Sequence, residues 1–331
     1  MRSSLAALCG RFIENRDRIK SGFGWEYSYI YPVCAEIFAD KRQEVSVERM
    51  KECWALLKEK TGIFSNFRGM IKLIVISMMA VDSDPERKLN NALNVYSELK
   101  ERFWRSPYLP VVSMTIADMV APGEYGAVAD KTKRIYKLMK SEHPFLTSDE
   151  DSVFAALLAL SDLTEEQAVS ETEACYDIMK EKFFFHNNVQ SLSNVLALGE
   201  GSAEEKCRKT MKIYDGLKER GRRYGTGYEL ATLGALALLP ESAETIVEDI
   251  LEVDKFLSGQ KGYGILGPGK KHRLMHAGML VGSDYIGGGD DKAMSSAAIS
   301  GAIALIIAQQ IAICAAVAAS SAAASSASSS S

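Results

Sequence analysis

Several signals that identify common classes of protein are missing from this sequence. None of its six cysteines forms a C-x-x-C pair; they stand far apart, at Cys9, Cys34, Cys53, Cys175, Cys207 and Cys314. This spacing excludes a zinc knuckle and a thioredoxin-like redox motif. Most of these cysteines have apolar neighbours, as reduced thiols of a protein core do, so we expect a cytoplasmic protein.

An excess of basic charge is also missing. The net charge is −4 and the pI is about 5.8, which argues against a nucleic-acid-binding protein with a basic surface. Two short basic stretches, Lys218–Arg223 and Gly269–Arg273, are typical of solvated loops. The apolar run near the amino terminus is interrupted by Arg11 before it reaches the length of a signal-peptide core. We therefore expect it to form the first turns of a helix.

A repeat with a period near 40 residues is present in the middle of the chain. Its most visible markers are four tyrosines and an aspartate, spaced by 40, 40, 38 and 40 residues: Tyr96, Tyr136, Tyr176, Tyr214 and Asp254. Twelve residues before each of them stand Asp84, Glu124, Thr164, Ser202 and Ser242. Asp, Thr and Ser cap helix starts because their side-chain oxygen accepts a hydrogen bond from an unpaired backbone N–H. The two signals together predict five long helices, with Glu124 the weakest of the caps.

The positions between cap and tyrosine also recur. In the first copy Leu89, Ala92 and Leu99 lie on one helical stripe with Tyr96, and the other copies place mostly apolar or small residues at the same offsets. We therefore expect the tyrosine rings at the seams between helices, rather than in a ladder that stacks on a ligand.

A shorter and nearly all-apolar segment precedes each capped helix. A single helix pair of this kind cannot cover its own apolar face, but stacked pairs can. The sequence thus predicts an all-α protein, an α-solenoid of about five two-helix repeats over residues 62–264. Helical caps are expected at both ends, with residues 1–61 as the amino-terminal cap and residues 265–319 as a loop and an Ala-rich helix. Residues 320–331 form a Ser/Ala tail too polar and simple to pack, and we expect it to be disordered.

The stretch Thr61–Gly69 reads TGIFSNFRG, and Phe12–Asp17 reads FIENRD. With the length and the helical repeats, these stretches resemble a bacterial family known only as domain of unknown function four thousand and three. The resemblance spans most of the chain and implies a bacterial, all-helical protein. The family has no assigned activity, cofactor or catalytic residue to carry over, so the resemblance leaves the function open. Within the motif, Arg68 is a candidate for binding an anion or the last carbonyls of a neighbouring helix. The alternative is a structural turn anchored by Phe64 and Phe67.

The run Gly262–His276 contains the most motifs. It matches G-x-G-x-x-G and G-x-x-x-x-G-K, but both motifs bind phosphate only between a strand and a helix, and a helical repeat precedes this run. A loop is therefore favoured over a nucleotide site, and we expect no cofactor. Lys270, Lys271 and Arg273 remain candidates for binding an anionic group. His272 and His276 are four residues apart and would share a helix face, as metal-ligating pairs do, with Asp284, Asp290 or Asp291 as a possible third ligand.

No charged residue follows Met294. The stretch Ser300–Ser320 has about the length of a bilayer span. However, Gln309 and Gln310 would lie in the middle of the membrane, and no basic cluster follows to fix an orientation. We expect instead a helix that packs on the end of the solenoid or across a dimer interface, with membrane contact as the alternative.

Three functions are consistent with this sequence. The first is an interaction scaffold or binding module with a protein or peptide partner and no nucleic acid. The second is a small-molecule-binding protein or enzyme that uses the Gly262–His276 loop and Arg68. The third is a membrane-associated factor anchored through Ser300–Ser320. We favour the first and lean against an enzyme, because no spacing shows histidines and carboxylates that converge.

Overall fold

A computed structural model describes residues 1–24, 26, 28–103, 108–148, 151–227, 229–263 and 269–287. Within these residues the chain is all-helical and contains no strand. It has fourteen α-helices: α1 (Ser3–Gly22), α2 (Ile30–Asp40), α3 (Val47–Lys60), α4 (Lys72–Ala80), α5 (Pro85–Arg102), α6 (Leu109–Met119), α7 (Tyr125–Glu142), α8 (Asp151–Ala159), α9 (Glu165–Met179), α10 (His186–Leu196), α11 (Ala203–Glu219), α12 (Glu229–Ala237), α13 (Ala243–Ser258) and α14 (Gly269–Gly287). Two 3-10 turns, η1 (Asn66–Arg68) and η2 (Pro122–Glu124), lead into α4 and α7.

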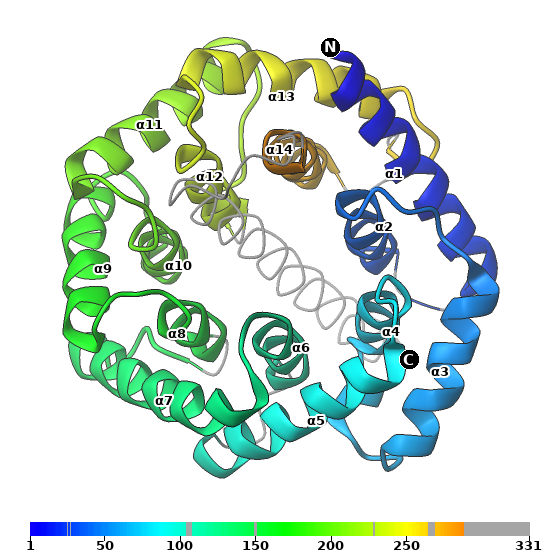
Figure 1. Ribbon diagram of the computed structural model, residues 1–331. Coiled ribbons are helices and arrows are strands. Elements are labelled where there is room, and N and C mark those ends of the chain that lie inside the picture. The colour runs from blue at the N-terminus through cyan, green and yellow to red at the C-terminus, as the bar shows by residue number, and fades with distance from the viewer. Residues whose placement is uncertain are drawn as a thin grey trace, which may run out of the picture.

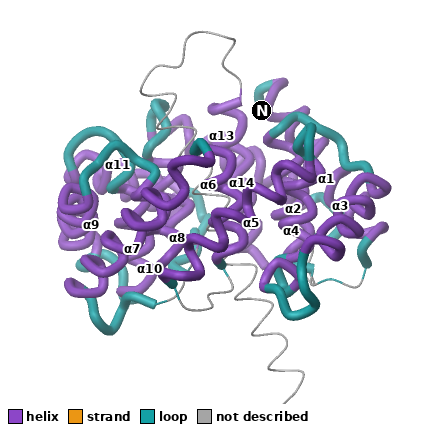
Figure 2. Tube along the Cα trace, turned by 60° about the horizontal axis from the view of Figure 1, so that its bottom comes forward, coloured by secondary structure: helices purple, strands orange, loops and turns teal. Residues whose placement is uncertain are grey.

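The helices form two concentric rings. Figure 1 shows the odd-numbered helices on the outside and the even-numbered helices within them, so the chain alternates between the rings along its whole described length. Each outer helix packs against the inner helix that follows it, and neighbouring inner helices pack against each other. Figure 2 shows the same ring tilted, with helices throughout its wall.

The sequence pattern of each helix explains its place. The outer helices are amphipathic: in α5 the residues Leu89, Ala92, Val95 and Leu99 are buried, and charged residues fill the opposite face. Several inner helices, such as α4, α8 and α12, are apolar on nearly every side, whereas α10 carries polar residues on one face. All nine residues of α8 are buried, as in a helix covered from all directions.

The predicted helix starts are confirmed. Asp84 accepts a hydrogen bond from the backbone N–H of Arg87, and Ser242 accepts one from Thr245. Thr164 and Ser202 form complete capping boxes. Glu124 makes no side-chain cap, and η2 leads into α7 instead.

The repeated tyrosines lie at the seams, as expected. Each packs against an aromatic ring of a neighbouring connection: Phe67 lies 5.1 Å from Tyr96, Phe103 5.4 Å from Tyr136, and Phe183 5.1 Å from Tyr214, measured between ring centroids. These pairs meet edge to face, which aromatic rings prefer. Tyr176 packs against two histidine rings.

The arrangement of an open solenoid with a cap at each end is not confirmed. Helices α1 to α3 alternate between the rings like the later ones, and α14 lies in the inner ring against α1 and α2. The first and last described helices are joined directly, because the Ser4 hydroxyl donates to Asp284 at 3.1 Å and Arg2 lies 3.1 Å from the same carboxylate. Seven pairs therefore complete a circle. The predicted Ala-rich helix and Ser/Ala tail lie outside the described residues.

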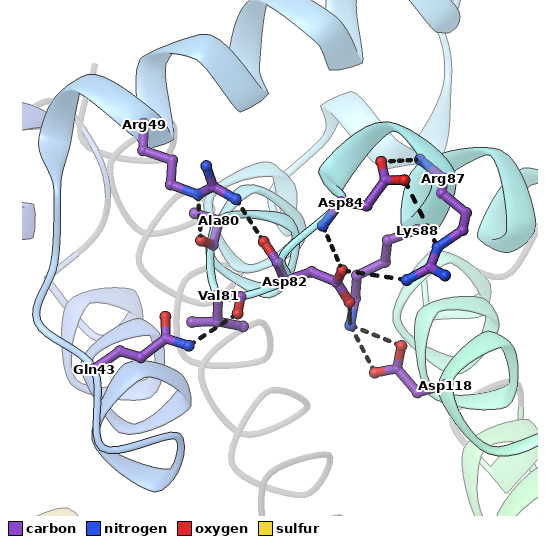
Figure 3. A network of polar contacts seen from close by, with 9 residues as sticks. All are labelled: Gln43, Arg49, Ala80, Val81, Asp82, Asp84, Arg87, Lys88 and Asp118. Carbon is purple, nitrogen blue, oxygen red and sulfur yellow. Dashed lines mark hydrogen bonds and ion pairs between the residues drawn. The ribbon is translucent and has the colours of Figure 1, made fainter.

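The two ends of the ring differ in their connections. Short turns join each inner helix to the next outer helix at one end, which we call the short-turn end. There, basic side chains of outer helices bind the ends of inner helices (Figure 3): Arg49 donates to the carbonyl of Ala80 at 2.8 Å, and Lys88 to Asp118 at 2.7 Å. Lys131 donates to the carbonyl of Ser161 at 2.8 Å in the same way. Arg49 and Lys131 thus satisfy backbone carbonyls at the ends of inner helices, and Lys88 forms an ion pair with the Asp118 carboxylate.

The connections from outer to inner helices lie at the opposite end, which we call the loop face. It comprises the described residues of the segments 23–29, 61–71, 103–108, 143–150, 180–185, 220–228 and 259–268. Contacts between neighbouring connections show that they share this end. Lys72 pairs with Glu26 at 2.8 Å, and Asn188 donates to the carbonyl of Thr226 at 3.0 Å.

Candidate functional site

The predicted anion-binding residues near the start of α14 lie on the loop face, but their side chains are not equivalent. Lys270 and Lys271 are exposed in the first turn of α14. The Arg273 guanidinium donates to the buried carboxylate of Asp254 at 2.6 Å, and Arg222 donates to the other oxygen of that carboxylate at 2.7 Å. Arg273 is therefore engaged in a buried ion pair. The anion site stays a prediction for the two lysines.

The two histidines of the predicted metal pair have different neighbours. His276 is buried, and its Nδ1 lies 2.8 Å from the hydroxyl of Tyr263. Burial, followed by the charges of His272 and Arg16, lowers the pKa of His276 to about 3, so its ring is neutral at physiological pH. His272 is half-buried beside the ring of Tyr29. Among the described residues no group of three or more His, Cys, Asp or Glu side chains is arranged to hold a metal ion.

Arg68 lies in the turn between α3 and α4. Its guanidinium donates to the carbonyl of Thr61 at 3.3 Å and lies over the ring of Trp54. Thr61 is the residue directly after α3, so Arg68 binds a carbonyl at a helix end, one of the two roles considered for it. Phe67 is buried as an anchor, whereas Phe64 is fully exposed. The interpretation that both phenylalanines anchor this turn is therefore wrong for Phe64.

The residues considered for an enzyme site do not form one cluster. His272 and Asp284 are twelve residues apart on the single helix α14, a separation of about 18 Å along its axis. Asp284 pairs with Arg2 where the ring closes, at the end of α14 far from the loop face. His272, at the loop face, and Asp284, at the ring closure, thus lie towards opposite ends of the ring.

An acidic pair at the ring closure, with Glu36 buried and Asp40 half-buried, was not singled out from the sequence. Glu36 and Asp40 lie one turn apart on α2. Burial and the nearby charge of Asp40 raise the pKa of Glu36 well above its usual value, and burial raises the pKa of Asp40 to about 7. The Ser283 hydroxyl of α14 donates to Asp40. Two acids four residues apart in an otherwise apolar helix were the signal available in the sequence.

The loop face carries most of the exposed large apolar side chains in the described part of the chain. Five large ones lie on three of its connections: Ile63 (77% exposed), Phe64 (100%), Phe145 (99%), Phe184 (88%) and Phe185 (56%). Elsewhere in the described part of the chain, only Met1 (42%) and Met119 (39%) are exposed apolar side chains of this size. Phe64, Phe145 and Phe184 thus present almost their whole rings to solvent from one end of the ring.

A cleft of about 710 Å³ opens beside two of these rings. It lies between the connections α7–α8, α9–α10 and α11–α12, and its lining includes Leu146, Phe154, Phe184, Phe185 and His186. Its volume is in the range of roughly 300–1,000 Å³ in which ligand sites fall. The backbone N–H of Ser148 donates to Asp151 at its edge, at 2.7 Å.

Charge along the outer helices follows a common order. Outer helices begin with acids in their first turn, as in α3, α9, α11 and α13, and end with lysine or arginine, as in α3, α5, α11 and α13. This order complements the helix dipole. Neighbouring outer helices meet through these charges, because Lys60 at the end of α3 pairs with Glu86 of α5 at 2.7 Å and Arg102 at the end of α5 pairs with Asp130 of α7 at 2.7 Å.

Comparison with known proteins extends these observations. No solved structure matches the chain. The chain is 23% identical over 257 residues to the uncharacterized protein YeaA of Bacillus subtilis (strain 168). The aligned region covers 73% of this chain and 77% of that relative. Among the described helices, none is both long and apolar enough to cross a membrane. The model of the family described as "Protein of unknown function (DUF4003)" matches residues 15–312, so the resemblance noted in the sequence is confirmed and this chain belongs to that family.

Proposed function

We propose that this protein is a binding protein, an interaction scaffold that holds its partner on the loop face. The observation that carries the proposal is the gathering of exposed Ile63, Phe64, Phe145, Phe184 and Phe185 at one end of the ring. Soluble proteins keep apolar side chains scattered on their surface, and a group of them marks an interaction site. Loops held on a rigid scaffold are a common place for such a site.

The placement of the perturbed titratable groups supports binding over catalysis. Active sites collect groups with shifted pKa values in an accessible cleft. Here the most strongly shifted carboxyls, Glu36 and Asp40, lie where α2 meets α14, and His276 is enclosed against Tyr263. The cleft beside Phe184 and Phe185 lies elsewhere. An apolar group of the partner would fit in this cleft, against these two rings.

Site-specific photo-crosslinking in living cells of the host tests the proposal. A benzophenone amino acid is placed at Phe64, Phe145 or Phe184, and at Met119 as a control, because Met119 is an exposed apolar residue outside the loop face. We expect covalent adducts from the three loop positions and none from Met119. Equal adducts from all four positions, or none from the loop face, would overturn the proposal.

A further inference from the structure

We propose that the partner of the loop face is the surface of a bilayer that contains anionic lipid. This inference rests on the proposed function, since it identifies what the loop face binds. The contact is made by aromatic loop tips that enter the interfacial region and by basic side chains beside them. It differs from a transmembrane anchor, because it uses only exposed side chains of the described ring.

The distribution of the exposed rings favours a flat partner. Phe64 lies on the connection between α3 and α4, whereas Phe145 and Phe184 lie on the α7–α8 and α9–α10 connections, on the other side of the ring (Figure 1). A peptide in the cleft beside Phe184 would not reach Phe64. A flat surface that covers the loop face extends over the connections on both sides of the ring. Amphipathic surfaces bind to membranes in this way, with apolar side chains in the interface and cations at the headgroups.

The charges around the tips favour an anionic surface. Exposed lysines stand in the last turns before each tip: Lys58 before Phe64, Lys140 before Phe145 and Lys182 before Phe184. Such residues are attracted to anionic headgroups over a distance that salt shortens.

Acidic residues share the same turns, namely Glu59, Glu142 and Glu181. The electrostatic attraction is therefore moderate, and the aromatic rings supply most of the binding.

Vesicle flotation of the purified full-length protein tests this inference. The probes are vesicles of phosphatidylcholine alone and vesicles with one quarter phosphatidylglycerol. We expect the protein to float with the anionic vesicles more strongly than with the neutral ones, and less strongly as salt is raised. Replacing Phe64, Phe145 and Phe184 together by Ser should weaken binding by about a thousandfold or more, since each buried ring contributes about tenfold or more.

Two controls separate loss of the loop-face rings from unfolding and from non-specific apolar contact. The three substituted rings are 88–100% exposed, so the triple variant should keep the thermal unfolding midpoint of the parent protein. The variant Met119→Ser removes an exposed apolar side chain outside the loop face and should bind vesicles as the parent does. Binding that the triple substitution leaves unchanged, or no binding to either vesicle, would overturn the inference. Protein adducts from the crosslinking positions without vesicle binding would show a protein partner, leaving the proposed function intact.

Discussion

The buried carboxylate of Asp254 offers a quantitative test of how the ring is held together. It occupies the place in the repeat where four earlier copies carry tyrosine. Its side chain is fully buried and accepts hydrogen bonds from Arg273 at 2.6 Å and Arg222 at 2.7 Å. One carboxylate thereby joins α13 to α14 and to the connection that precedes α12.

The variant Asp254→Asn removes the charge and keeps the size of the side chain. Removing one partner of a buried ion pair costs about 3–5 kcal/mol, because the other charge stays without its counterion. The Arg222 side chain is 43% exposed and can be rehydrated, so we expect about 3 kcal/mol. For a chain of 331 residues, with about 2.1 cal/mol/K of unfolding entropy per residue, that is a fall of roughly 4 °C in the unfolding midpoint.

Thermal unfolding followed by circular dichroism measures this loss, with Asp130→Asn as the matched control. Asp130 also accepts from an arginine, Arg102 at 2.7 Å, but its side chain is 54% exposed, and such pairs contribute at most about 1 kcal/mol. A second variant, Arg222→Phe with Asp254→Tyr, reproduces the residue types of the Phe183–Tyr214 contact and should be more stable than Asp254→Asn. If Asp254→Asn loses no more stability than Asp130→Asn, the reasoning is refuted.

Three further predictions concern single residues. Phe67→Ala should lower the free energy of unfolding, measured in urea, by about 3–5 kcal/mol, because the Phe67 ring is buried. Phe64→Ala should change the free energy of unfolding by less than about 0.5 kcal/mol. Equal losses in the two variants would contradict the assigned burial. Ser202→Ala removes a capping box and should cost about 1 kcal/mol in the same assay, and a neutral result would show that the cap is not formed. Because the pKa of Asp40 rises from its unfolded value to about 7 on folding, its contribution to stability is present at low pH and is lost as pH rises towards 7. The unfolding midpoint of Asp40→Asn should therefore decrease less between pH 4 and pH 7.5 than that of the parent protein. An equal decrease in both proteins would show that the Asp40 carboxyl is hydrated.

Local features of the fold were predictable from the sequence because each is decided within a few residues. A cap such as Ser202 needs only its own side chain and the first helical turn. The seam position of Tyr96 follows from helical periodicity. These signals located the five capped helices and the apolar helices that precede them.

Closure of the ring was not predictable from the same signals. It depends on the angle between successive helix pairs, which is set by side-chain packing across each seam and accumulates over seven pairs. The contacts that complete the circle, such as Ser4 with Asp284, join residues 280 positions apart. No periodic pattern links them, so the terminal segments were interpreted as caps.

The candidate site was only partly predictable, because neighbouring residues of one type have opposite environments. Phe64 and Phe67 stand in the same short motif, yet one is fully exposed and the other fully buried. The turn η1 directs Phe67 towards Tyr96 and leaves Phe64 in solvent. Arg273 was predicted to bind an anion, but its guanidinium donates to Asp254, nineteen residues earlier in the chain. Nothing in the sequence near Arg273 indicates this partner.

The closed ring is the claim on which the loop face depends, and a single disulfide tests it. Ser4→Cys and Asp284→Cys are introduced together in a background with Cys314→Ser, and the oxidised protein is run on a non-reducing denaturing gel. The five cysteines of the described residues are buried, so the new pair is the one open to mild oxidation. Ser4→Cys with Ser161→Cys, which lies in the turn between α8 and α9, is the control. A closed ring predicts an intramolecular crosslink for the first pair alone, seen as a shift in gel mobility that reducing agent reverses. An open array would leave positions 4 and 284 far apart. Absence of the crosslink would therefore contradict closure of the ring.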